Sequence, residues 1–134
     1  MRIILKKKAE ENLKAGKLLF DKAMFNASIH CYYYSCLQLM KFVILDKFGF
    51  TIETVDRQTE SGNSHNWIIN KIKELYLEKY DYSYSRIFSK DIKRLKNLRK
   101  DADYNLVEID KDKTIEADNL TCNIFDYFKR KNLI

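Results

Sequence analysis

The chain of 134 residues has no proline, and it has only three glycines, three cysteines and two histidines. Proline and glycine commonly form the turns between strands, so their scarcity argues against an all-β chain and favours helices. The cysteines are odd in number and form no C-x-x-C motif, which indicates neither a disulfide framework nor a zinc site. The N-terminal stretch has no small-residue cleavage site, so a cytoplasmic location is expected.

The sequence also lacks most of the motifs that carry enzyme chemistry. It contains no glycine-rich phosphate loop and no Gly-x-Ser-x-Gly motif, which argues against nucleoside triphosphatases and serine hydrolases. His30 and His65 stand in no Glu-x-x-His or His-Glu-x-x-His arrangement, so neither a metal nor another cofactor is predicted. His30 lies in an apolar stretch and is predicted to be a core residue, whereas His65 suits either a helix start or a site.

The stretch AMFNASIHCYYYSCLQLM, residues 23–40, has no charged residue and continues into KFVILDKF. Apolar and aromatic residues occur at nearly every helical phase, which predicts a helix from about Asn26 to Phe48 that is buried on all sides. Gly49 suits a left-handed cap at its C-terminus. Polar residues interrupt the run at every turn, so it is not predicted to cross a membrane.

Four further segments with helical periodicity are predicted over about residues 6–22, 65–80, 86–103 and 114–131. Gly16 lies on the apolar stripe of the first one and indicates a close helix crossing. The polar residues 51–64 are predicted to form a loop, the tyrosine-rich residues 80–85 a connector and residues 105–113 a linker. We therefore expect one all-α domain over residues 1–134, an up-and-down bundle of four to five helices.

Arg99 is out of pattern in the predicted helix over residues 86–103. The apolar stripe of that helix follows the spacing of core-facing residues, and its members are Phe88, Ile92, Leu95, Arg99 and Ala102. Lys90 to Asp101 is also the most basic stretch of a chain with a net charge of +6. A near-buried arginine beside a positive flank suits a phosphate-binding cleft. The alternative is an arginine that pairs with Asp103, four residues on, or reaches solvent from the edge of the stripe.

The order of these segments resembles the HEPN domains of prokaryotes, particularly the small stand-alone ones found beside minimal nucleotidyltransferases. The resemblance covers nearly the whole chain. It includes the segment HNWIINKIKEL, residues 65–75, and its most specific parts are the run Tyr32, Tyr33 and Tyr34 and the segment LRKDADY, residues 98–104. The up-and-down bundle of that family agrees with the helical pattern predicted from the residues.

Active HEPN proteins are metal-independent ribonucleases that form dimers, and their motif is an arginine followed after four to six residues by a histidine. The resemblance places Arg99 on that arginine, but Tyr104, Asn105 and Leu106 stand where the histidine would be. Tyrosine titrates near pH 10 and cannot exchange a proton near neutral pH as histidine does. In toxin pairs of the family, a nearby tyrosine can be nucleotidylated by the partner enzyme, and Leu106 occupies that position here.

Three functions follow from these observations. The first is a dimeric HEPN module of a toxin–antitoxin or defence system that binds RNA, a nucleotide or a nucleotidyltransferase without cleaving RNA. The second is an active endoribonuclease, in which Arg99 holds the phosphate and Asp103 orients it. Tyr104 or His65 then donates a hydrogen bond. The third is a structural bundle without an anion site. In the first two, the expected contacts to RNA or nucleotide are Lys93, Lys96, Lys100 and His65.

Overall fold

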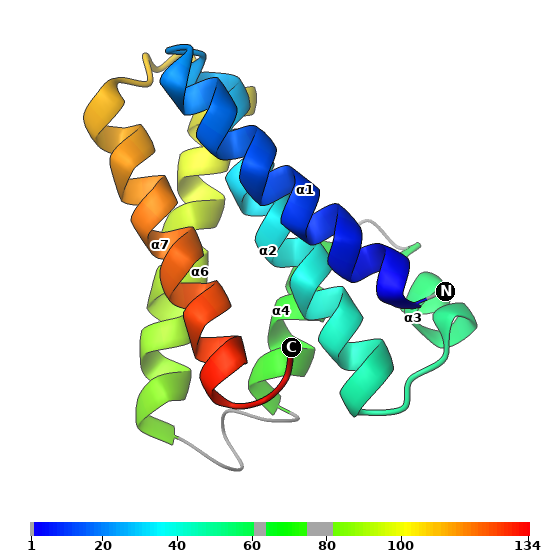
Figure 1. Cartoon of the computed structure of the whole chain (residues 1–134). Coiled ribbons are helices and arrows are strands. Elements are labelled where there is room, and N and C mark those ends of the chain that lie inside the picture. Colours follow the sequence, from blue (N-terminus) through cyan, green and yellow to red (C-terminus); the bar gives the residue numbers. More distant parts are fainter. Residues whose placement is uncertain (1, 61–63, 75–81) are drawn as a thin grey trace.

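A computed structural model of the chain describes residues 2–60, 64–74 and 82–134 (Figure 1). These residues form six helices and no strand, which confirms the all-α prediction. The helices are α1 (Arg2–Asp21), α2 (Phe25–Lys47), α3 (Ile52–Thr59), α4 (Ser64–Ile72), α6 (Tyr82–Asp103) and α7 (Lys111–Arg130). The expected count of four to five helices is therefore too low.

The long helices α1, α2, α6 and α7 run alternately up and down, as expected for the bundle (Figure 1). The shorter α3 and α4 follow α2 in the chain, and α4 packs against both α2 and α3. Among the described residues, no helix is both long and apolar enough to cross a membrane.

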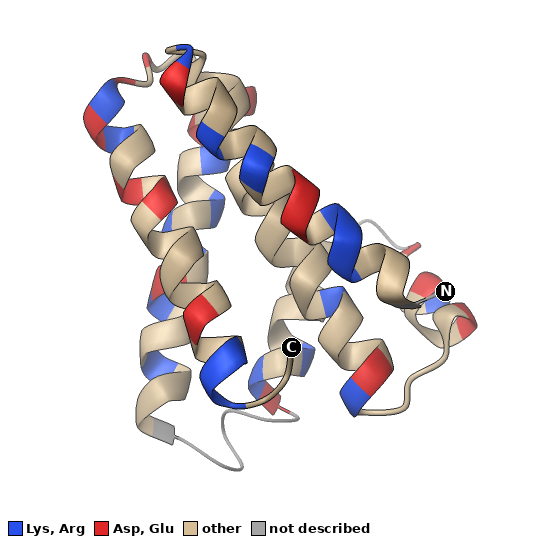
Figure 2. Cartoon of the chain, in the orientation of Figure 1, with Lys and Arg blue, Asp and Glu red and all other residues tan. Residues whose placement is uncertain are grey.

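α2 is the central helix, because it packs against α1, α4, α6 and α7. Its only charged residues are Lys41, Asp46 and Lys47, and its ribbon is almost uncharged in Figure 2. The four neighbours nevertheless leave one strip open near its N-terminus, where Asn26 and His30 are exposed. The predictions that this helix is buried on all sides and that His30 is a core residue are therefore wrong.

Gly16 allows α1 to cross α2 closely, as its position on the apolar stripe predicted. Its carbonyl oxygen accepts a hydrogen bond of 2.7 Å from Ser28 Oγ. A Cβ atom at this position would lie 2.7 Å from the buried Tyr32 ring. At the other end of α2, Gly49 has a φ of 71° and forms the predicted left-handed cap.

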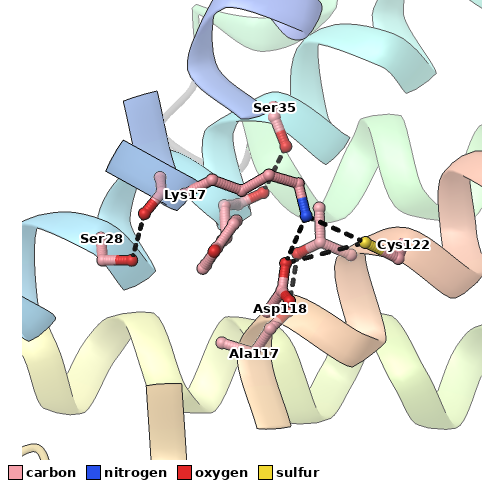
Figure 3. A network of polar contacts seen from close by, with 9 residues as sticks. Lys17, Ser28, Ser35, Ala117, Asp118 and Cys122 are labelled. Atoms are coloured by element: carbon pink, nitrogen blue, oxygen red, sulfur yellow. Dashed lines mark hydrogen bonds and ion pairs between the residues drawn. The ribbon is translucent and has the colours of Figure 1, made fainter. Parts of the chain in front are cut away.

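Polar contacts tie α7 to its neighbours. Lys17 Nζ of α1 lies 3.0 Å from Asp118 Oδ1 and 3.6 Å from Cys122 Sγ of α7 (Figure 3). On the other side, the Arg94 guanidinium of α6 donates two hydrogen bonds of 2.8 Å to the Glu116 carboxylate. Arg94 is thus part of the basic stretch of the sequence, but its charge is paired with that of Glu116 on α7.

Residues 52–59 were expected in a loop, yet they form α3. Thr51 Oγ1 caps this helix by accepting a hydrogen bond of 3.1 Å from the Thr54 N–H. Val55 is fully buried and anchors the helix to the core. The prediction of a loop was wrong because Ile52 and Val55 are too few apolar residues to make a recognisable helical stripe.

The starts of α6 and α7 also differ from the prediction, and the predicted end of α4 is not tested. α6 begins at Tyr82, so the last residues of the expected connector are helical, and the Tyr84 ring stacks on Tyr127 at 3.6 Å. α7 begins at Lys111, where Asp110 Oδ1 accepts a hydrogen bond of 2.8 Å from the Lys113 N–H. α4 is described to Ile72, and residues 75–81 of the predicted helix and connector lie outside the described residues.

Candidate anion-binding site

The Arg99 side chain lies where α6 meets α2 and the first turn of α4. A cavity of about 340 Å³ opens beside it. The cavity is lined by Tyr34 of α2, Ser64, His65 and Asn66 of α4, Lys96 and Arg99 of α6, and Tyr104. The fold thus brings together four of the residues that the sequence singled out, from segments that are more than thirty residues apart.

Arg99 is buried although it carries a charge, with 5% of its surface exposed. Its guanidinium carbon lies 4.9 Å from the centre of the Tyr33 ring and 5.4 Å from that of Tyr104, within the range of cation–π contact. The ion pair with Asp103 is present, but Nη1 lies 3.9 Å from Oδ2, which is too far for a hydrogen bond. Arg99 is therefore held in place mainly by aromatic rings.

The guanidinium keeps unused hydrogen-bonding capacity. Arginine has five N–H donors, and the one hydrogen bond to a described residue runs from Nη2 to His65 Nδ1 at 3.4 Å. The buried Nε atom has no partner among the described residues. A buried donor without a hydrogen-bond partner is rare and costs free energy. An oxygen atom of a bound anion could accept this hydrogen bond and remove the cost.

The contacts of His65 determine its tautomer. A guanidinium can only donate, so His65 Nδ1 accepts the hydrogen bond from Arg99. Tyr33 Oη also lies 3.0 Å from Nδ1, and burial raises the pKa of the Tyr33 phenol, so its hydroxyl is protonated and donates. Neutral His65 therefore carries its proton on Nε2, which makes it a hydrogen-bond donor toward a ligand.

The surroundings of His65 also keep it neutral. Burial lowers the pKa of His65, and the charges of Arg99 and Lys96 lower it further. Burial together with Lys100 and Arg99 likewise lowers the pKa of Lys96. A bound anion would relieve this repulsion between cations, because opposite charge favours the protonated forms.

The first turn of α4 lies at the same cavity. Ser64, His65 and Asn66 begin the helix and line the cavity. The first N–H groups of a helix have no intrahelical acceptor, and the helix dipole gives this end a partial positive charge. Lys96 Nζ donates a hydrogen bond to Asn66 Oδ1, which fixes a positive charge at this end of α4.

Asp103 orients a second histidine that the sequence analysis had assigned to the core. Its Oδ2 lies 2.8 Å from His30 Nδ1, and the His30 side chain is 49% exposed. The Tyr34 ring contacts both imidazoles, with centroid distances of 4.6 Å to His30 and 5.7 Å to His65. The sequence contained a signal for this arrangement, because residues 30, 33 and 34 of one helix lie on the same face.

Lys93 and Lys100 do not line the Arg99 cavity. They line an adjoining cavity of about 360 Å³ between α4 and α6, which shares Asn66 and Lys96 with it. In the part of the chain that the structure describes, no group of three or more His, Cys, Asp or Glu side chains could hold a metal ion. The Arg99 cavity is lined by two cations, Lys96 and Arg99, whose chemistry suits the binding of an anion.

Comparisons of the chain with known protein families, with curated proteins and with solved structures find no match. The function must therefore be inferred from the site itself.

Proposed function

We propose that the Arg99 cavity binds a phosphate group of RNA or of a nucleotide, and that the chain is a HEPN-type module of a prokaryotic toxin–antitoxin or defence system. The observation that carries this proposal is the buried Arg99 guanidinium with its unpartnered Nε. Phosphate matches it because its oxygens can accept two parallel hydrogen bonds from a guanidinium. Lys96, the Nε2–H of His65 and the first turn of α4 supply further donors around the same space.

The geometry favours binding over cleavage by His65. A general base needs a free lone pair within reach of the substrate. The lone pair of His65 is on Nδ1, where Arg99 and Tyr33 already donate hydrogen bonds. Tyr104, which stands where the HEPN motif would place a histidine, is 72% exposed, and it can donate a hydrogen bond or stack on a base.

The second candidate function is metal-independent cleavage of RNA, and the contact between His30 and Asp103 favours it. Asp103 lies next to Arg99 and holds an exposed imidazole. In such a reaction His30 would take the proton of the ribose 2′-hydroxyl, and the 2′-oxygen would attack phosphorus. The bond to the 5′-oxygen would break, with a proton supplied to that oxygen by solvent water, to leave a 2′,3′-cyclic phosphate and a 5′-hydroxyl.

The proposal includes a homodimer and a nucleotidyltransferase as a partner protein, working in the cytoplasm. Support for a protein contact comes from the segment that follows α6, where Tyr104, Leu106 and Val107 are exposed, with Leu106 fully so. Exposed apolar residues that cluster beside a binding site are typical of an interface. The three cysteines are free thiols, which fits a reducing compartment.

The decisive experiment compares the wild type with Arg99→Ala and Arg94→Ala. The two substitutions remove the same charge from one helix, but Arg94 is engaged by Glu116 outside the cavity. We expect fluorescence anisotropy with a labelled single-stranded RNA to show a loss of affinity of about tenfold or more for Arg99→Ala. Arg94→Ala should bind like the wild type.

The same samples, together with the variant His30→Gln, distinguish the three functions. Intact RNA on a denaturing gel, together with binding that depends on Arg99, supports the binding module. RNA shortened by the wild type but not by His30→Gln supports cleavage. A wild type that neither binds nor cleaves RNA, and does not bind nucleotides, would leave only a structural bundle and overturn the proposal.

A further inference from the structure

Two more cavities adjoin the Arg99 cavity and share walls with it. One, of about 420 Å³, is lined by residues of α1 and α2 and shares Ser64 and His65 with the Arg99 cavity. We call it the α2-side cavity. The other is the cavity of about 360 Å³ between α4 and α6, which shares Asn66 and Lys96, and we call it the α6-side cavity. We call the three cavities together the row, because the Arg99 cavity shares two lining residues with each of the other two.

The described residues that line this row include many cations and no aspartate or glutamate. From one end of the row to the other, the cations are Lys8, Lys41, Arg99, Lys96, Lys73, Lys93 and Lys100. The chain contains 19 acidic residues, so acidic residues are common elsewhere in the protein but are not found among the described residues that line the row. Such a lining attracts an anion that carries several charges.

Each flanking cavity combines its cations with an apolar wall. Leu37 and Ile68 form such a wall in the α2-side cavity, and Ile69 and Ile92 form one in the α6-side cavity. Side-chain amides add donors and acceptors at both ends. This combination of charge, apolar wall and amide groups fits a nucleotide, whose charged phosphate is joined to a flat base with polar edges.

We propose that the row binds a single strand of RNA, with one phosphate at Arg99 and neighbouring nucleotides in the α2-side and α6-side cavities. This inference rests on the proposed function and extends it from one phosphate to a strand. Tyr104, which lines the central cavity and is 72% exposed, offers a ring on which the central base can stack.

A strand fits the row better than a mononucleotide or a duplex. A mononucleotide would occupy one cavity and leave the other two without a ligand. A duplex pairs its bases with each other, so they could not enter cavities that the His65 ring and the contact of Lys96 with Asn66 divide. In a single strand, each base is free to enter a cavity while the backbone follows the cations.

The test measures binding of uridine monophosphate and of labelled oligouridylates of about three, six and nine nucleotides. Probe integrity is checked on denaturing gels, and salt dependence is recorded. The variants are Lys93→Ala with Lys100→Ala in the α6-side cavity, and Lys8→Ala in the α2-side cavity. The matched control is Lys14→Ala with Lys129→Ala, two exposed lysines that line none of the three cavities.

We expect affinity to rise with length and then level off once the row is filled. The double variant in the α6-side cavity should weaken binding of the longest oligomer about tenfold. Its affinity for uridine monophosphate should change less than about twofold, and the control should change neither. The wild type should also show a steeper salt dependence for the oligomer than for the monophosphate, because more phosphates are neutralised.

The failures of the two proposals can be told apart. If uridine monophosphate binds as tightly as the oligomers, and only Arg99→Ala weakens it, the extended row is wrong while the phosphate site stands. If double-stranded RNA competes as well as the single strand, the assignment of bases to the cavities is wrong. If Arg99→Ala binds every probe like the wild type, the phosphate site itself is overturned, and the row with it.

Discussion

Burial of the Arg99 guanidinium is the main energetic feature of this protein at the scale of single residues. Moving an unpaired charge out of water costs several kcal/mol. This cost is on the order of the attraction energy that a buried ion pair gains. Here the centres of the Tyr33 and Tyr34 rings lie 4.9 and 5.8 Å from the guanidinium carbon, and Asp103 Oδ2 lies 3.9 Å from Nη1. These contacts hold the cation in position, while its buried Nε atom has no hydrogen-bond partner among the described residues.

The lowered pKa of His65 predicts how stability depends on pH. In the unfolded chain His65 has its ordinary pKa of 6.5, whereas burial and the charges of Arg99 and Lys96 lower that pKa in the folded protein. Between the two pKa values the unfolded state binds more protons, so the free energy of unfolding falls as the pH drops below about 6.5. Urea unfolding followed by circular dichroism from neutral to mildly acidic pH measures this loss.

The variant His65→Gln is the control for that prediction, because glutamine does not titrate. Its free energy of unfolding should fall less than that of the wild type over the same pH range. Equal pH dependence of the two proteins would mean that other groups cause the loss, and that His65 is not held neutral by its surroundings.

At the scale of helices, the position of α1 on α2 depends on a single missing side chain. Gly16 lets the two helices approach until the Tyr32 ring lies where a Cβ atom would be. Ser28 then reaches the Gly16 carbonyl oxygen with a hydrogen bond of 2.7 Å. Tyr32 precedes Tyr33 and Tyr34, so this crossing also fixes the turn of α2 that carries the rings around Arg99.

Gly16→Ala should therefore destabilise the protein, although alanine favours a helix by about 1 kcal/mol over glycine. The added methyl would lie 2.7 Å from the Tyr32 ring, and overpacking of this kind costs roughly 1–3 kcal/mol. Urea unfolding measures the change. Gly49→Ala is the comparison, because nothing lies within 4 Å of that position and only its φ of 71° is strained. A Gly16→Ala protein that is more stable than the wild type would contradict the close crossing.

Helix types were easier to predict from the sequence than helix ends. The run without charge in α2 and the stripe with Arg99 in α6 predicted those helices, since burial and periodicity depend on many residues at once. α3 and the first turn of α6 did not follow from the pattern. They are stabilised by a cap at Thr51 and by the stacking of Tyr84 on Tyr127, and such contacts depend on a few residues each.

At the scale of the whole molecule, the exposed segment after α6 predicts the oligomeric state. Leu106 is fully exposed, and Tyr104 and Val107 lie beside it at the edge of the Arg99 site. If this segment is the contact between two copies, the wild type should sediment as a dimer at micromolar concentration. Leu106→Asp should sediment as a monomer, because a buried unpaired charge opposes association.

Leu18→Asp is the matched control for that experiment. Leu18 is also an exposed leucine, with 60% of its surface accessible, but it belongs to α1 and not to the segment after α6. The control should sediment like the wild type. A wild type that is monomeric at every concentration would contradict the dimer and leave the Arg99 site as a property of one chain.

The amino-acid sequence alone determined the helical class, the central position of α2 and the unusual place of Arg99 in an apolar stripe. These features follow from composition and from periodicity along one helix, which need no knowledge of neighbouring helices. Only the tertiary structure decided what surrounds Arg99. His65 and His30 come from two other helices, and Arg94 is turned toward Glu116, because the packing of helices brings together residues that no local spacing relates.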